Sequence, residues 1–110
     1  MRIFIALLLA TSLVGCGSPY ANVIQGEWVD AEANPPEVKM SFSSDGTGTY
    51  LDTVWRADQP TRFRWRLDDE ELCSTIVEPF ETEEFCQILE RDDQGRLRIG
   101  GGHWLRHLSR

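Results

Sequence analysis

A succession of short runs in which apolar and polar residues alternate constrains the fold of this chain most strongly. The cleanest run is 61–67, where Phe63, Trp65 and Leu67 alternate with arginines. Because successive side chains of a β-strand point to opposite faces, this pattern predicts a strand with one face in a core and the other in solvent. The solvated face would carry Arg62, Arg64 and Arg66.

Seven further runs of similar character follow one another, with turn signals such as Ser44-Asp45-Gly46 between them. The expected strands are 23–31, 38–43, 47–55, 61–67, 72–78, 84–90, 97–100 and 103–109. Consecutive strands joined by short turns run antiparallel, and closure of such a sheet removes its exposed edges. We therefore predict an all-β fold, a small antiparallel up-and-down barrel of about eight short strands whose side chains fill its interior.

The first residues do not share this pattern. Arg2 precedes an apolar run over 3–10, which is shorter than the roughly 20 residues that span a bilayer. A short apolar segment behind a basic residue is typical of a secretion signal. The segment ends in Leu13-Val14-Gly15-Cys16, which resembles the lipobox of bacterial lipoproteins. This resemblance implies cleavage before Cys16 and a lipid on its thiol; an ordinary signal with an incidental cysteine is the alternative.

The lipobox resemblance divides the chain into three parts. Residues 1–15 would be a cleaved signal peptide, 16–22 a lipidated tether and 23–110 the β domain. Acyl chains such as palmitate would anchor the protein to a membrane of the cell envelope. Gly17 and Ser18 follow the anchor, and neither is the aspartate that retains many lipoproteins at the inner membrane. We therefore expect the outer membrane, facing the periplasm, if the host is Gram-negative.

Charge excludes one class of partner. After removal of the first 15 residues, ten basic and eighteen acidic side chains remain in 95 residues. Such an acidic surface repels nucleic acid and anionic headgroups. We expect no nucleic-acid partner, and we expect membrane contact through the lipid anchor alone.

Two cysteines remain once Cys16 carries lipid. Cys73 and Cys86 would lie in an oxidising compartment, where an even number of thiols indicates a disulfide. A hairpin turn centred on Pro79-Phe80 would place the two directly opposite each other on neighbouring strands. The sequence therefore predicts a structural Cys73–Cys86 bond; a catalytic pair is the alternative, although the spacing is not C-x-x-C.

A second resemblance concerns the barrel. Gly26-Glu27-Trp28 on the first expected strand matches the G-x-W element that opens lipocalin-like barrels, and the stretches 42–50 and 63–67 are similar to those of small lipocalin-like lipoproteins of bacteria. In that family the tryptophan closes one barrel end and an arginine of the last strand packs over it. The resemblance implies that Trp28 and Arg106 form this barrel-end pair.

No residue pattern indicates catalysis, a metal or a cofactor. His103 and His107 stand four apart, which on a strand is about 13 Å, too far to share one metal. The acidic runs 68–71 and 81–84 lack the pattern of a calcium loop and are expected to be solvated turns. The run 100–102 of three glycines is expected to form a bend at a barrel corner.

These observations favour a non-enzymatic lipoprotein whose domain binds a small apolar molecule or an envelope protein. A surface inhibitor or immunity-type module against a hydrolase or a phage is the alternative, and an enzyme is the least favoured. The four tryptophans, Trp28, Trp55, Trp65 and Trp104, would fill the core or line a pocket. An open pocket would favour the small ligand, and a filled barrel with exposed loop aromatics would favour a protein partner.

Overall fold

The computed structural model describes residues 18–53 and 59–108. In this part of the chain eight β-strands form and no helix is present. The strands are β1 (Gly26–Asp30), β2 (Val38–Phe42), β3 (Thr47–Asp52), β4 (Thr61–Asp68), β5 (Glu71–Glu78), β6 (Phe85–Arg91), β7 (Leu97–Ile99) and β8 (Trp104–His107). Each expected strand is present with shifted ends, so the all-β prediction is confirmed; Trp55 lies outside the described residues.

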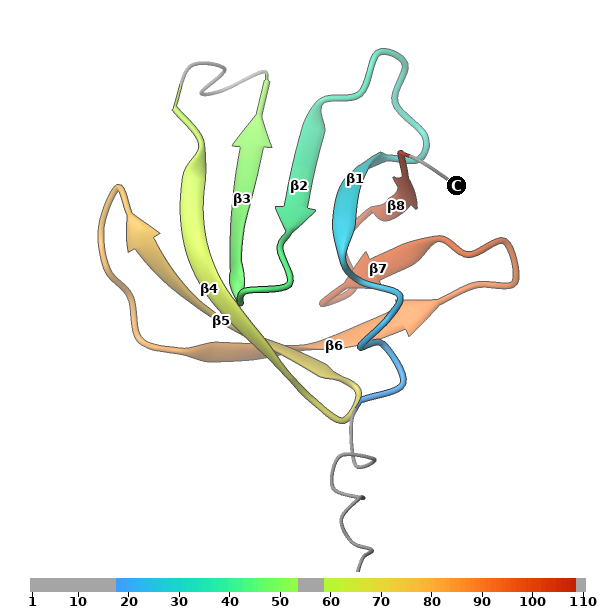
Figure 1. Ribbon diagram of the computed structural model, residues 1–110. Helices are drawn as coiled ribbons and strands as arrows, with labels where there is room; N and C mark the ends of the chain where they lie inside the picture. The colour runs from blue at the N-terminus through green and yellow to red at the C-terminus, as the bar shows by residue number, and fades with distance from the viewer. Residues whose placement is uncertain (1–17, 54–58, 109–110) are drawn as a thin grey trace, which may run out of the picture.

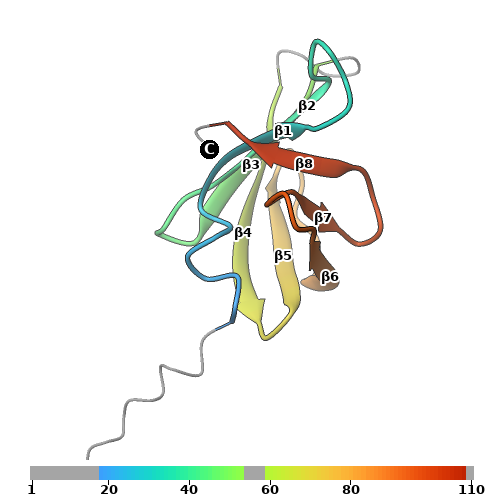
Figure 2. The same ribbon diagram turned by 90° about the vertical axis from the view of Figure 1, so that its right-hand side faces the viewer.

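Each strand pairs antiparallel with the next, and β8 returns to pair with β1 (Figure 1). Figure 2 shows β1 and β8 side by side where the sheet closes, in the register Trp28 opposite His107 and Asp30 opposite Leu105. The predicted closed up-and-down barrel is therefore confirmed. Closure leaves neither β1 nor β8 as a free edge for another chain to pair with.

The two ends of the barrel differ. The segment before β1 enters beside the β4–β5 turn, and the β1–β2 loop lies at the other end (Figure 1). We call the first the closed end and the second the open end. Buried apolar side chains concentrate toward the closed end and include Ile24, Trp28, Phe42, Leu72, Leu89 and Leu97.

The segment before β1 is packed against the barrel rather than extended. The Tyr20 hydroxyl donates a hydrogen bond of 3.1 Å to the carbonyl of Leu89, and Ile24 is fully buried. The Ser18 hydroxyl donates to the carbonyl of Asp69 in the β4–β5 turn. From residue 18 onward, the stretch that the sequence analysis assigns to a tether therefore belongs to the folded unit.

The alternation in β4 is confirmed. Phe63 is buried, and Trp65 and Leu67 are partly buried against the core cluster. The Trp65 ring meets the Phe42 ring edge-on at 5.5 Å between centroids, and its indole N–H donates to the carbonyl of Thr47 at 2.9 Å. Trp65 thus contributes its ring to the core and keeps its polar atom paired.

The outer face of β4 carries the three exposed arginines, Arg62, Arg64 and Arg66. Two of them pair with acidic side chains: Arg62 with Glu78 at 3.0 Å and Arg66 with Glu84 at 2.9 Å. The hydrogen bond from Arg66 lowers the pKa of the Glu84 carboxyl. Because these pairs are exposed and screened by solvent, each is expected to contribute little to the stability of the fold.

The predicted disulfide and its register are confirmed. Cys73 on β5 is bonded to Cys86 on β6, 13 positions later, and the two face each other in the ladder. The bond lies on the outer side of the barrel, with Cys73 buried and Cys86 exposed. The β5–β6 ladder ends at Ser74 opposite Phe85 while β5 continues to Glu78, so the connection is wider than a tight turn.

Removal of this bond should destabilise the barrel measurably. The variant Cys73→Ala/Cys86→Ala is expected to lose about 3 kcal/mol of unfolding free energy, the chain-entropy value for a loop of this size. Urea unfolding followed by tryptophan fluorescence measures the loss. The wild-type protein in reductant is the control, because it lacks the bond but keeps both side chains. An unchanged midpoint in the reduced protein would contradict the prediction.

Candidate functional site

A cavity of about 470 Å³ occupies the barrel interior at the open end. The apolar side chains around it are Val38, Met40, Tyr50, Phe63, Leu72, Ile76, Phe85, Ile99 and Leu105. The prediction that side chains fill the interior is therefore wrong. The number of strands sets the width of a barrel, and the interior of an eight-stranded barrel is wide enough either to be filled by side chains or to hold one small ligand. Short strands make this barrel shallow without making it narrow.

The distribution of large side chains explains why the cavity opens at one end only. Phe42 stacks edge-on with both Phe63 and Trp65, at 5.6 and 5.5 Å between ring centroids. Opposite them, Gly48 has no side chain, and a β-carbon there would come within 2.5 Å of the Phe63 ring. These rings therefore fill the interior near the closed end, and Phe63 forms the part of this cluster that borders the cavity.

A few polar groups interrupt the apolar wall. Thr61, Ser74 and Gln87 line it from β4, β5 and β6, and Asp30 lines it from the end of β1. Asp30 is only 8% exposed, and its Oδ1 has no hydrogen-bond partner among the described residues. Small-molecule sites typically have this composition, in which an apolar wall holds the ligand and a few polar groups orient it.

Asp30 is a candidate site residue that no sequence pattern singles out. Trp28 and Asp30 are two positions apart on β1, so their side chains point to the same face of the strand. Once Trp28 is assigned to the interior, Asp30 must point inward as well. This relation between the two positions is the signal that would have identified it.

A second hollow adjoins the cavity at its mouth. The two share Asp30, Val38, Tyr50 and His103, and the mouth adds Glu32, Glu37 and Asp52. Burial raises the pKa of the Tyr50 phenol, and the nearby carboxylates of Asp52 and Asp30 raise it further. The described lining of the mouth and the cavity contains no lysine or arginine. The entrance is therefore acidic.

Trp28 closes the other end of the barrel, as the G-x-W resemblance implies. Its side chain is fully buried, and its indole N–H donates to the carbonyl of Ile24 at 2.8 Å. The His107 ring packs edge-on against it at 4.9 Å between centroids. A second contact fixes this imidazole, because His107 Nε2 lies 2.9 Å from the carbonyl oxygen of Gln25.

The pairing of Trp28 with Arg106 is corrected. Trp28 faces His107 across the β1–β8 ladder, whereas Arg106 faces Val29 and is exposed. Adjacent residues of β8 point to opposite faces, so only one of the two can reach Trp28. Stacking of arginine on tryptophan does occur, but on the outer wall, where Arg98 lies 4.6 Å from the Trp104 ring centroid.

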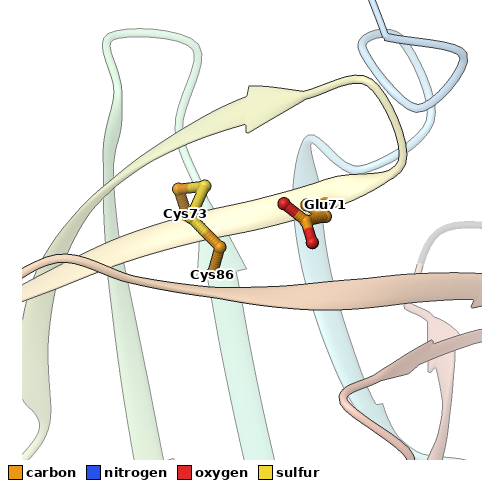
Figure 3. A group of neighbouring side chains, drawn as sticks. All are labelled: Glu71, Cys73 and Cys86. Atoms are coloured by element: carbon orange, nitrogen blue, oxygen red, sulfur yellow. A yellow bond between two sulfur atoms is a disulfide. The ribbon is translucent and has the colours of Figure 1, made fainter.

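The two histidines, His103 and His107, lie apart in the described part of the chain. His103 lines the mouth while His107 packs at the closed end. Glu71 lies beside Cys73 and Cys86, as Figure 3 shows. Both sulfur atoms of that group are joined in the disulfide, and a metal would need a free thiolate.

Comparisons with family models, with curated proteins and with solved structures find no match for this chain. Within residues 18–53 and 59–108, no helix is long and apolar enough to cross a bilayer.

The contact between Trp28 and His107 requires glycine at position 26. Gly26 has a φ of +114°, and a β-carbon there would lie 2.3 Å from His107 Nε2. Gly26→Ala should therefore cost about 2–5 kcal/mol of unfolding free energy, from backbone strain and overpacking together. Chemical denaturation measures the cost.

Gly95→Ala is the matched control for this substitution. Gly95 also has a positive φ, of +79°, but nothing lies within 4 Å of a β-carbon built on it. It should cost only the strain component, about 1–2 kcal/mol. Equal costs at the two positions would mean that the approach of His107 does not constrain position 26.

Proposed function

We propose that this protein is a lipid-anchored envelope lipoprotein whose lipocalin-like barrel binds a small apolar ligand without chemical conversion. The observation that carries the proposal is the cavity of about 470 Å³ at the open end. Its volume falls within the range of about 300–1,000 Å³ typical of small-molecule sites. The G-x-W element, with Trp28 buried at the opposite end, supports the lipocalin-like assignment.

The position of Ser18 supports an orientation for the anchored protein. Ser18 contacts Asp69 at the closed end, and Cys16 precedes it by two residues. Two residues of extended chain reach about 7 Å at most. A lipid on Cys16 would therefore hold the closed end against the bilayer, and the mouth of the cavity would face away from it.

A protein partner is the second candidate. Phe80, in the loop between β5 and β6, is 61% exposed, and Ile88 on the outer wall of β6 is 52% exposed. Exposed aromatic and aliphatic side chains of this kind serve as anchors in protein interfaces. The inhibitor or immunity-type role would use such a surface, whereas ligand binding uses the cavity, so blocking the cavity separates the two.

Filling the cavity should abolish binding of an apolar probe. The neutral fluorophore N-phenyl-1-naphthylamine would be titrated into the mature chain, from residue 16 onward with Cys16→Ser, which contains all eight strands and avoids detergent. Ile76 lines the cavity, so Ile76→Trp should occupy it and weaken binding at least about tenfold, or about 1.4 kcal/mol.

Thr75→Trp is the matched control, because Thr75 is the neighbouring position on β5 and faces the exposed Arg64. It should leave probe binding unchanged. Absence of binding to the protein without these substitutions, or equal weakening by both, would overturn the proposed ligand site. Thermal unfolding of each variant verifies that the barrel is intact.

Cys16 should be the residue that carries the lipid. In a bacterial host with lipoprotein processing, the mature full-length product should begin at Cys16, carry diacylglycerol and partition into the membrane fraction. Cys16→Ser should abolish both the lipid and the membrane association. Mass spectrometry of the N-terminal peptide decides the matter, and recovery of an unlipidated chain that begins elsewhere would contradict the anchor.

A further inference from the structure

The buried carboxylate of Asp30 is the group in the cavity that most needs a partner. The residue is 8% exposed, and its Oδ1 makes no hydrogen bond to the described residues. Buried polar atoms in proteins are nearly always paired, because an unpaired one has lost its contacts with water without replacing them. The atom belongs to a residue that lines both the cavity and its mouth. A ligand there can supply the missing donor.

The surroundings of Asp30 determine the charge of that donor. Glu32, Glu37 and Asp52 line the mouth beside it. His103 is the only basic side chain in the described lining. Acidic groups gathered at the entrance of an apolar cavity focus a negative potential there. They attract a cationic head and repel a carboxylate, a sulfate or a phosphate.

The rest of the cavity determines the other half of the ligand. Beyond Asp30 the wall is formed mainly by apolar side chains such as Met40, Ile76 and Leu105. A hydrocarbon chain gains free energy on leaving water for such a wall, in proportion to the apolar area that it buries. The cavity therefore combines a deep apolar part with an acidic rim.

We infer that the cavity selects a single-chain amphiphile with a primary ammonium head, whose N–H donates to Asp30 Oδ1 and whose apolar chain lies between Met40, Ile76 and Leu105. This inference rests on the proposed ligand-binding function and specifies its ligand class. A primary ammonium supplies both the positive charge and the hydrogen bond. A quaternary ammonium supplies only the charge.

A series of ligands with one chain length and different heads tests the inference. Octylammonium, octyltrimethylammonium, octanol and octanoate would each displace N-phenyl-1-naphthylamine from the mature Cys16→Ser chain. Octylammonium should bind at least about tenfold more tightly than octanol, and octyltrimethylammonium should lie between them. Octanoate should bind most weakly, because the acidic mouth repels it.

Asp30→Asn tests the residue itself. This substitution removes the charge and nearly preserves the shape, so the preference for octylammonium over octanol should fall at least about tenfold. Binding of the neutral probe should persist. Glu32→Gln is the matched control, because it removes one charge from an exposed side chain at the mouth. Its effect should stay within about fivefold, as for other exposed charges.

The outcomes distinguish failure of this inference from failure of the proposed function. If the probe does not bind the wild-type chain, the ligand-binding function itself is overturned. If the probe binds but octanol or octanoate competes as well as octylammonium, ligand binding stands and the ammonium preference is overturned. The wild-type series gives this answer even if Asp30→Asn fails to fold. Equal effects of Asp30→Asn and Glu32→Gln would overturn the role of Asp30.

Discussion

The pairing of the last strand with the first is the constraint on which the rest of this structure depends. Without the β1–β8 ladder, the eight strands would form an open sheet with two free edges and no enclosed interior. The contact between Trp28 and His107 lies within this ladder and also fills the closed end. Glycine at position 26 permits the contact, because the His107 ring occupies the space that a side chain would need. One local arrangement thus closes the sheet and closes the end of the barrel.

The barrel separates its packed core from its open cavity along its axis. Large rings and the segment before β1 fill the closed end, where Trp28, Phe42 and Ile24 are fully buried. At the opposite end mainly apolar side chains surround an open space, and the Cys73–Cys86 bond ties β5 to β6 just before the two strands diverge. Substitutions at half-buried positions of the cavity wall, such as Ile76, therefore remove fewer packing contacts than substitutions around the fully buried Trp28.

The fold could be predicted from the sequence because each strand carries its own period-2 signal, and the cysteine register follows from the position of one turn. The cup could not. Alternation shows which face a side chain occupies, but not how much of the interior the opposing faces leave empty. The wrong assignment of Arg106 has a related cause. Neighbouring residues of a strand point to opposite faces, so the choice of Arg106 in place of the adjacent His107 puts the side chain on the wrong face of β8. Asp30 was missed because its role depends on the inward direction of Trp28.

The position of Asp30 in the β1–β8 ladder determines how well ordered this residue is before a ligand binds. It lies opposite Leu105 on β8, and the next backbone N–H, of Ala31, donates to the carbonyl of Trp104 at 2.9 Å. The carboxylate is therefore carried by paired backbone rather than by a loop, so the backbone at Asp30 is ordered before any ligand arrives. Groups held in this way require little further ordering on binding, so more of the interaction free energy appears as affinity. The ladder that closes the barrel would then also position the group that recognises the ligand head.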